Sequence, residues 1–167
     1  MGDKMTKRTF LGGAAAAAGA AMAGLFAGRP SEASAASFEV NLTPGQWRQR
    51  LSPAQFRVLR QQGTERPGSS PLNKEHRAGS YACAGCQLPV FRSADKFDSG
   101  TGWPSFIRAI PGNIGTQGDN SLFAARTEVH CRRCGGHLGH VFDDGPRPTG
   151  QRWCMNGVAM RFVPGRA

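Results

Sequence analysis

Acidic residues are scarce in this chain of 167 residues, which has 11 Asp and Glu against 21 Lys and Arg and a formal net charge of +10. The basic residues are scattered instead of gathered in a run or on one helical face. This distribution predicts a solvated basic surface that favours acidic partners, and it makes nucleic-acid binding the less favoured interpretation. Beyond residue 35 the chain also lacks an apolar run of the roughly 20 residues that a membrane-spanning helix needs. We therefore expect neither a nucleic-acid-binding protein nor an integral membrane protein.

The first 35 residues lack the marks of a folded segment. Lys7 and Arg8 precede an uncharged run rich in Ala and Gly over residues 12–28, and Ala33-Ser34-Ala35 has the small-x-small form of a cleavage site. We expect residues 1–35 to be an export signal resembling the twin-arginine type, with Lys7 where the first arginine usually stands. Residues 36–167 then form one exported, periplasmic domain that leaves the membrane once the signal is removed. A membrane anchor is the alternative, but the run is short and weakly apolar for a span.

Helical periodicity is absent from Gly79 onward, where Gly and Pro recur every few residues between short apolar segments. This pattern is typical of a small antiparallel β structure. Ahead of it, Thr43-Pro44-Gly45-Gln46 and Ser52-Pro53-Ala54-Gln55 each place a hydroxyl at the N-cap, proline first in the helix and glutamine third. We therefore predict two short N-terminal helices and a mainly β domain whose last strand covers residues 152–162.

Four of the five cysteines form two Cys-x-x-Cys pairs, Cys83 with Cys86 and Cys131 with Cys134, which are separated by 44 residues. Two residues between thiols let both sulfurs of a pair reach one tetrahedral ion, so two pairs predict a tetrathiolate zinc site. Such a site has no open coordination position and is therefore structural. Two disulfides are the alternative in an oxidising compartment, and iron in the same cage is another.

Cys154 is left without a partner and is the candidate nucleophile. Alternate side chains of an extended strand share a face, so Arg152, Cys154 and Asn156 are expected to converge, and a nearby cation favours the reactive thiolate. His137 and His140 lie in a segment too rich in glycine for a helix and can face the same cleft as acid-base groups. Burial of Cys154 as a small apolar residue is the alternative.

Trp103 stands in a segment, residues 98–106, that two glycines and a proline keep from being a regular element. We expect a shaped loop that presents the indole ring. The ring would line a pocket for an apolar group or fill the core.

Three motifs occur in order along the chain: Gly100-Thr101-Gly102-Trp103-Pro104-Ser105-Phe106, the run from Cys131 to Pro146, and Arg152-Trp153-Cys154-Met155-Asn156. Together they closely resemble the B-type peptide-methionine (R)-S-oxide reductases, and the similarity runs from about Thr43 to Val163. The resemblance implies a fold of two small antiparallel sheets, of the β-tent type, with short N-terminal helices. It also implies a structural zinc ion bound by Cys83, Cys86, Cys131 and Cys134 in those members that have it.

The resemblance further implies a reaction, the thiol-dependent reduction of the R epimer of methionine sulfoxide in oxidised proteins and peptides. Cys154 would attack the sulfoxide sulfur and become a sulfenic acid. His140 and His137 would hold and protonate the oxygen, and Asn156 would help to orient them. The implied substrate-binding residues are Trp103, Arg152 and Phe142.

One departure from the family pattern is Thr101, because many members have a second cysteine at this position. With the other four cysteines bound to zinc, no cysteine is left to resolve a Cys154 sulfenic acid within the chain. We therefore predict that a thioredoxin-like protein or a small thiol reduces Cys154 directly, in a cycle that repairs oxidised exported proteins.

Two other function classes fit parts of the pattern. A zinc-ribbon binding module would keep the metal site and bury Cys154, and a redox carrier would use the Cys-x-x-Cys pairs as dithiols. Export argues against nucleic acid as the partner of the first class, and the aromatic residues are not interleaved with the arginines as a stacking surface requires. For the second class, one tightly held zinc ion per chain would leave no dithiol available.

Overall fold

The computed structural model describes residues 38–120 and 125–165. The predicted export signal and the apolar segment at residues 122–124 lie outside the described residues. Within the part that the structure describes, none of the helices has the length and hydrophobicity that a membrane crossing requires.

The two predicted helices are present as α1 (Pro44–Arg50) and α2 (Pro53–Gln61). Each begins with a capping box, in which the N-cap hydroxyl of Thr43 or Ser52 accepts a hydrogen bond from the third residue. Such a cap stabilises a helix by about 1 kcal/mol, which matters for helices of two turns. Both helices turn apolar side chains inward, and those buried are Trp47, Phe56, Val58 and Leu59.

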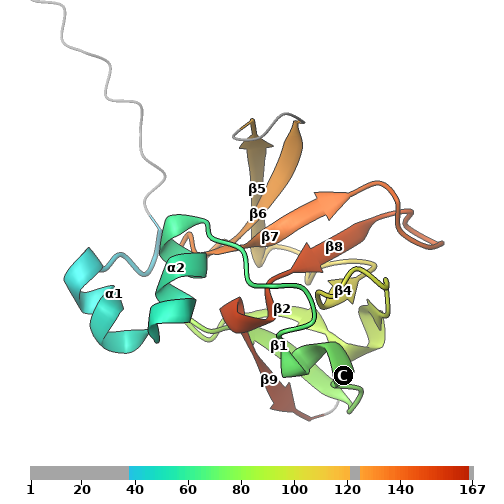
Figure 1. Cartoon of the computed structure of the whole chain (residues 1–167), viewed down its shortest axis with the longest axis horizontal. Helices are drawn as coiled ribbons and strands as arrows, with labels where there is room; N and C mark the ends of the chain where they lie inside the picture. Colours follow the sequence, from blue (N-terminus) through green and yellow to red (C-terminus); the bar gives the residue numbers. More distant parts are fainter. Residues whose placement is uncertain (1–37, 121–124, 166–167) are drawn as a thin grey trace, which may run out of the picture. The chain divides into compact units, whose positions relative to one another are not determined.

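Nine strands within the described ranges form two antiparallel sheets (Figure 1). The smaller sheet has the order β2 (Pro89–Arg92), β1 (Gly79–Cys83), β9 (Met160–Pro164). The larger sheet has the order β3 (Lys96–Phe97), β4 (Ser105–Phe106), β8 (Arg152–Met155), β7 (His137–Phe142), β6 (Arg126–Cys131), β5 (Ile114–Asp119). The predicted mainly β fold with two antiparallel sheets and short N-terminal helices is confirmed.

Aromatic rings join the two sheets in the core. Phe91 of the smaller sheet stacks on Phe106 of the larger one with 4.3 Å between ring centroids, and Tyr81 packs edge-on against Phe106 at 4.9 Å. All three side chains are fully buried. Burying a side chain of this size contributes about 1.5–3 kcal/mol, so these contacts fix how β4, and with it β8, lies on the smaller sheet.

The prediction of one strand over residues 152–162 is wrong. The chain leaves the larger sheet after β8, makes a single 3-10 turn (η3, Gly157–Ala159) and enters the smaller sheet as β9. The physical reason is the buried carboxylate of Glu65, which accepts hydrogen bonds from the backbone N–H groups of Gly157 and Val158. Those N–H groups are thereby unavailable to a strand ladder.

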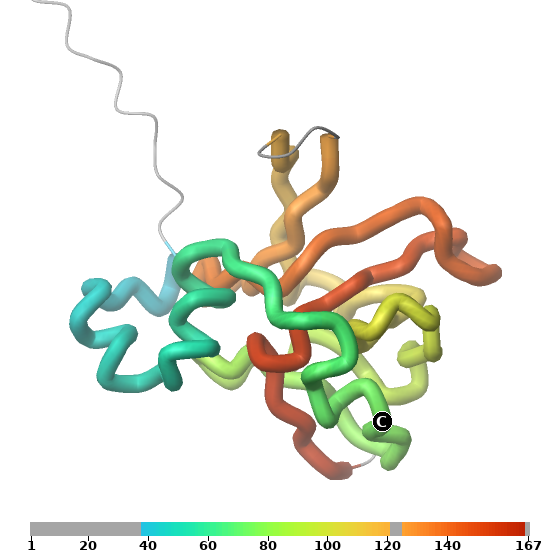
Figure 2. Tube along the Cα trace, viewed as in Figure 1, coloured from blue at the N-terminus to red at the C-terminus, as the bar shows by residue number. Residues whose placement is uncertain are grey.

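The segment between α2 and β1 contains a further 3-10 turn (η1, Pro71–Lys74), and a third (η2, Ser93–Asp95) follows β2. Figure 2 shows the backbone of this segment as it runs from α2 past η3. Two hydrogen bonds join it to the Trp103 loop, because the Gly68 N–H and the Asn73 side chain both donate to the carbonyl of Gly102, at 2.7 and 2.9 Å. The segment therefore helps to hold that loop in place.

Gly139 provides a test of how closely β7 and β8 must approach. A Cβ at this position would lie 2.1 Å from the carbonyl oxygen of Cys154, whereas a Cβ at Gly118 in β5 would meet no atom within 4 Å. We expect Gly139→Ala to lower the free energy of unfolding by about 1–3 kcal/mol or more, because two backbones must separate. Gly118→Ala is the matched control and should stay within about 0.5 kcal/mol of the wild type. Denaturant unfolding measures both, and equal midpoints for the two variants would contradict the expectation.

Candidate functional site

Cys154 lies in β8, between β4 and β7 in the larger sheet, where it pairs with Ser105 on one side and His140 on the other. The residue is half-buried. Its sulfur lies 3.9 Å from the hydroxyl of Thr101. The predicted alternative of a fully buried, inert Cys154 therefore does not describe its position.

A pocket of about 130 Å³ opens at Cys154. Its lining residues are Thr64, Trp103, Arg126, Gly139, His140, Phe142, Cys154 and Asn156. Pockets for drug-sized ligands measure about 300–1,000 Å³, so this one suits a single side chain. A larger hollow of about 480 Å³ between α2 and η3 contains neither Cys154 nor a histidine, and its size does not make it the reactive site.

The surroundings of Cys154 act on its pKa in opposite directions. Burial raises the pKa of the thiol, while Thr101, Ser105 and the charge of Arg152 lower it without cancelling the effect of burial. This differs from the sequence expectation of a thiolate favoured by a nearby cation. The residue rests as a thiol, so a base must remove its proton when it reacts.

His137 and His140 both lie in β7, three residues apart. In a regular strand an odd spacing places two side chains on opposite faces. Here the register between β6 and β7 shifts by one residue next to Leu138, which forms a β-bulge. The bulge brings the two imidazole rings together, with their centroids 5.3 Å apart.

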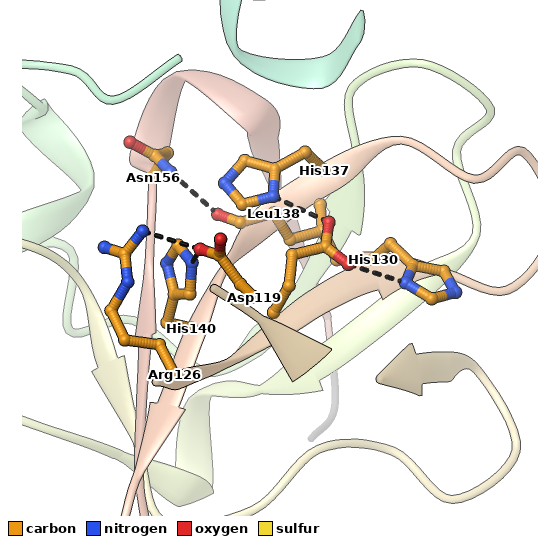
Figure 3. Close-up of polar contacts among 8 residues, drawn as sticks. Asp119, Arg126, His130, His137, Leu138, His140 and Asn156 are labelled. Carbon is orange, nitrogen blue, oxygen red and sulfur yellow. Dashed lines mark hydrogen bonds and ion pairs between the residues drawn. The ribbon is translucent and has the colours of Figure 1, made fainter. Parts of the chain in front are cut away.

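His140 lines the pocket and is held by a carboxylate. Its Nε2 lies 2.7 Å from Asp119 Oδ2, and Arg126 donates to the same oxygen at 2.6 Å (Figure 3). Burial lowers the pKa of His140, and Arg126 and His137 lower it further, against the opposite effect of Asp119. The ring is thus neutral near pH 7, as a base for the thiol proton must be.

His137 is almost fully buried and does not line the pocket. Its Nδ1 lies 2.7 Å from one oxygen of Glu128, and the other oxygen of this carboxylate binds His130 (Figure 3). The structure thus places the two predicted histidines side by side, but only His140 at the pocket.

Asn156 acts on the bulge and not on a histidine ring. Its backbone N–H and side-chain amide both donate to the carbonyl of Leu138, at 2.8 and 3.1 Å. Its Oδ1 accepts from the backbone N–H of Glu65 at 2.9 Å, and the Glu65 carbonyl accepts from Trp103 Nε1 at 3.2 Å. Asn156 therefore links the bulged strand to the Trp103 loop through Glu65.

Arg152 and Phe142 lie beside each other at the edge of the site. The guanidinium lies 4.4 Å from the ring centroid of Phe142 and makes two hydrogen bonds of 2.8 Å to the carboxylate of Asp144. Phe142 lines the pocket and Arg152 does not. Arg152 thus contributes charge near Cys154, and Phe142 contributes surface.

The four predicted metal ligands form one cluster, in which all the sulfur atoms lie within 4.8 Å of one another. Cys83 lies 3.7 Å from Cys134, and Cys86 lies 3.4 Å from Cys131. These distances exceed the roughly 2.05 Å of a disulfide bond and approach the edge of about 3.8 Å of a tetrahedron built from Zn–S bonds of about 2.3 Å. The donor set fits one tetrahedrally bound ion.

Comparison with known proteins agrees with this arrangement. Residues 51–164 match the SelR domain family. A peptide methionine sulfoxide reductase MsrB of Bradyrhizobium diazoefficiens is 52% identical over 120 residues, which cover 71% of this chain and 86% of that relative. The chain belongs to the MsrB family. An MsrB of Agrobacterium fabrum is 47% identical over 127 residues, 75% of this chain and 94% of that protein, so the similarity covers nearly whole relatives.

The resemblance predicted from the motifs is thus confirmed. Among solved structures, the Yippee-like domain of Mis18 is 13% identical, with a TM-score of 0.42, and covers 55% of this chain and 100% of that chain. A likeness this weak carries no argument.

Several residues of this MsrB-family site were not found from the sequence: Glu65, Asp119, Arg126 and Glu128. All four are charged, and two of them, Glu65 and Glu128, are buried. In a chain so poor in acids, a Glu between strand-forming neighbours, as in Thr127-Glu128-Val129, was an available signal. Pairing Asp119 with His140 could not be found this way, because the two residues lie on strands that are not neighbours.

Proposed function

We propose that this protein reduces the R epimer of methionine sulfoxide, mainly in oxidised proteins and peptides, to methionine. Membership of the MsrB family supports methionine sulfoxide reduction. The observation that carries the assignment to residues is the small pocket that joins a cysteine, a neutral histidine and an indole ring. A pocket of this size accommodates one oxidised methionine side chain projecting from a peptide.

The chemistry follows from the protonation states at the site. His140 takes the proton of Cys154, the sulfur attacks the sulfoxide sulfur, and the same proton passes to the sulfoxide oxygen. The oxygen then moves to Cys154: a bond between this oxygen and the Cys154 sulfur forms while the S–O bond to methionine and the transient S–S bond break, which leaves a sulfenic acid on Cys154 and releases methionine. Cys154 is oxidised and the substrate reduced by two electrons, with no net uptake of protons in this half of the cycle.

Stereochemical preference would come from the walls of the pocket. Trp103 and Phe142 offer apolar surface for the methyl group, while His140 lies where an oxygen can be bound. The sulfoxide sulfur is chiral and carries a methyl group, an oxygen and the rest of the side chain. One of its two epimers therefore fits such a pocket better than the other. This arrangement supports selection of one epimer, which we assign as R from the family resemblance.

Zinc is the metal that we propose for the cysteine cluster. The residues Cys83, Cys86, Cys131 and Cys134 would fill all four positions of a tetrahedral ion, which leaves none for substrate. When bound, the ion supplies no redox chemistry and holds two distant parts of the chain together. The reaction therefore remains with Cys154.

The second half of the cycle needs an external thiol. Thr101, 3.9 Å from the Cys154 sulfur, occupies the place from which a second cysteine could attack, and a hydroxyl cannot form a disulfide. We propose that a thioredoxin-like protein or a small thiol attacks the sulfenic acid and releases water. A second thiol then frees Cys154.

We further propose that residues 1–35 direct the chain to the periplasm and are removed there, so that residues 36–167 repair exported proteins. N-terminal sequencing of the chain recovered from fractionated cells tests this proposal. A chain recovered from the cytoplasm with Met1 or Gly2 first would contradict it.

The function is tested by following the separate R and S epimers of dansylated methionine sulfoxide with dithiothreitol as reductant. We expect the R epimer to be consumed and the S epimer to remain. The control Cys154→Ser should lose turnover by at least about a hundredfold, because the nucleophile is removed, while it keeps one zinc ion per chain. Equal loss of both epimers, or turnover by the Ser variant, would contradict the proposal.

The one-cysteine cycle is tested by mass spectrometry after one equivalent of substrate without reductant. The wild type should gain one oxygen on Cys154. The variant Thr101→Cys should instead lose two hydrogens and form a disulfide between the introduced thiol and Cys154, because the side chain at this position already lies close to that sulfur and only a small approach is needed. An internal disulfide in the wild type would refute the cycle.

A further inference from the structure

Glu128 is a buried carboxylate that the reaction described above does not use. Its side chain is 4% exposed, and its two oxygens bind Nδ1 of His137 at 2.7 Å and Nδ1 of His130 at 2.9 Å. Burial raises the pKa of Glu128, but the hydrogen bonds and charges of the two histidines lower it to about 2. An ionised carboxylate only accepts hydrogen bonds, so both Nδ1 atoms must carry the proton.

The other ring nitrogen of His137 has no hydrogen-bond partner among the described residues, although it is buried. Figure 3 draws this Nε2 on the side of the ring toward Asn156. Leaving a buried polar atom unpaired costs about 1–3 kcal/mol. This nitrogen lies beside the ring of His140, which does line the pocket.

The two neighbouring histidines are held through opposite nitrogens. Asp119 binds Nε2 of His140, and Glu128 binds Nδ1 of His137. With 5.3 Å between the ring centroids, a proton on one ring disfavours a proton on the other, as the effect of His137 on the pKa of His140 indicates. The two carboxylates therefore fix which nitrogen of each ring is held and which is left for other contacts.

We propose that Glu128 is a positioning residue of the reductase reaction, which acts by fixing the ring and the tautomer of His137. This inference rests on the proposed function. Glu128 does not line the pocket of Cys154, and its carboxylate is linked to that site through the ring of His137. With Nδ1 fixed as the donor, Nε2 is the one nitrogen of His137 that can exchange a proton with the site.

If Glu128 only stabilised the fold, loss of its hydrogen bond to His137 and loss of its hydrogen bond to His130 would affect turnover equally. His130 is bound by the same carboxylate but packs against Gly115 in β5, and its ring is not in contact with His140. The two hydrogen bonds of the carboxylate can therefore be tested separately. Loss of the hydrogen bond to His137 should lower turnover, and loss of the hydrogen bond to His130 should not.

The experiment combines steady-state kinetics with long-range ¹H–¹⁵N spectra of protein labelled in its histidines. In the wild type we expect His137 to have a protonated Nδ1 and an unprotonated Nε2. Glu128→Gln keeps the shape of the side chain but can donate as well as accept, so both tautomers of His137 should appear. We expect kcat for the R epimer to fall at least about tenfold with KM within about twofold, because a transition-state group is misaligned.

His130→Asn is the matched control, and it should keep kcat within about twofold of the wild type. Zinc content and the thermal midpoint are measured for both variants to compare their folding. The inference is overturned if wild-type His137 is protonated at Nε2, which requires no variant to fold. It is equally overturned if Glu128→Gln keeps its kcat, if it loses kcat with the His137 tautomer unchanged, or if His130→Asn loses as much. A wild type without reductase activity would refute the proposed function, and the spectra would still test the tautomer.

Discussion

The bulge at Leu138 is the constraint on which the reactive site depends. A strand that alternates strictly would separate His137 from His140, and no choice of rotamer would bring the rings back to one face. One extra residue brings the two rings to the same face, and the carbonyl of Leu138 in the bulge accepts two hydrogen bonds from Asn156. Because Asn156 also binds the Glu65 backbone, the same small network sets the strand, the turn after Cys154 and the loop that carries Trp103. The pocket is thus defined by backbone geometry before any substrate contact is made.

The cysteine cluster links the two sheets, whereas the network at Leu138 fixes only the surroundings of the pocket. Cys83 ends β1 in the smaller sheet and Cys131 ends β6 in the larger one, so one ion would join the two sheets at the ends of these inner strands. Structural zinc sites have apparent binding free energies of about 10–16 kcal/mol, against a net stability of about 5–15 kcal/mol for a whole domain. The aromatic contacts of Phe91 and Phe106 join the same sheets elsewhere in the core. Two separate links therefore keep β8 fixed relative to the smaller sheet.

Much of this could be predicted because local chemistry determines it. The capping boxes of Thr43 and Ser52 specify helix starts within four residues, and the spacing of the cysteine pairs specifies a tetrahedral cluster. The turn after Met155 could not be predicted, because its cause is Glu65, a residue from a distant segment whose carboxylate replaces the strand ladder. The net direction of the pKa of Cys154 could not be predicted for a related reason. A neighbouring arginine is visible in the sequence, whereas the burial that outweighs it comes from strands paired across the chain.

The order of the cysteines along the chain has a consequence for biosynthesis. A ribosome releases residues from the N-terminus onward, so all four cluster thiols emerge before Cys154 does. The four cluster thiols can then gather around an ion before Cys154 leaves the ribosome. With an ion bound in this way, the four potential partners for a wrong disulfide would be occupied when the last sulfur appears. The nascent chain can therefore reach its native thiol arrangement without an isomerase to correct it.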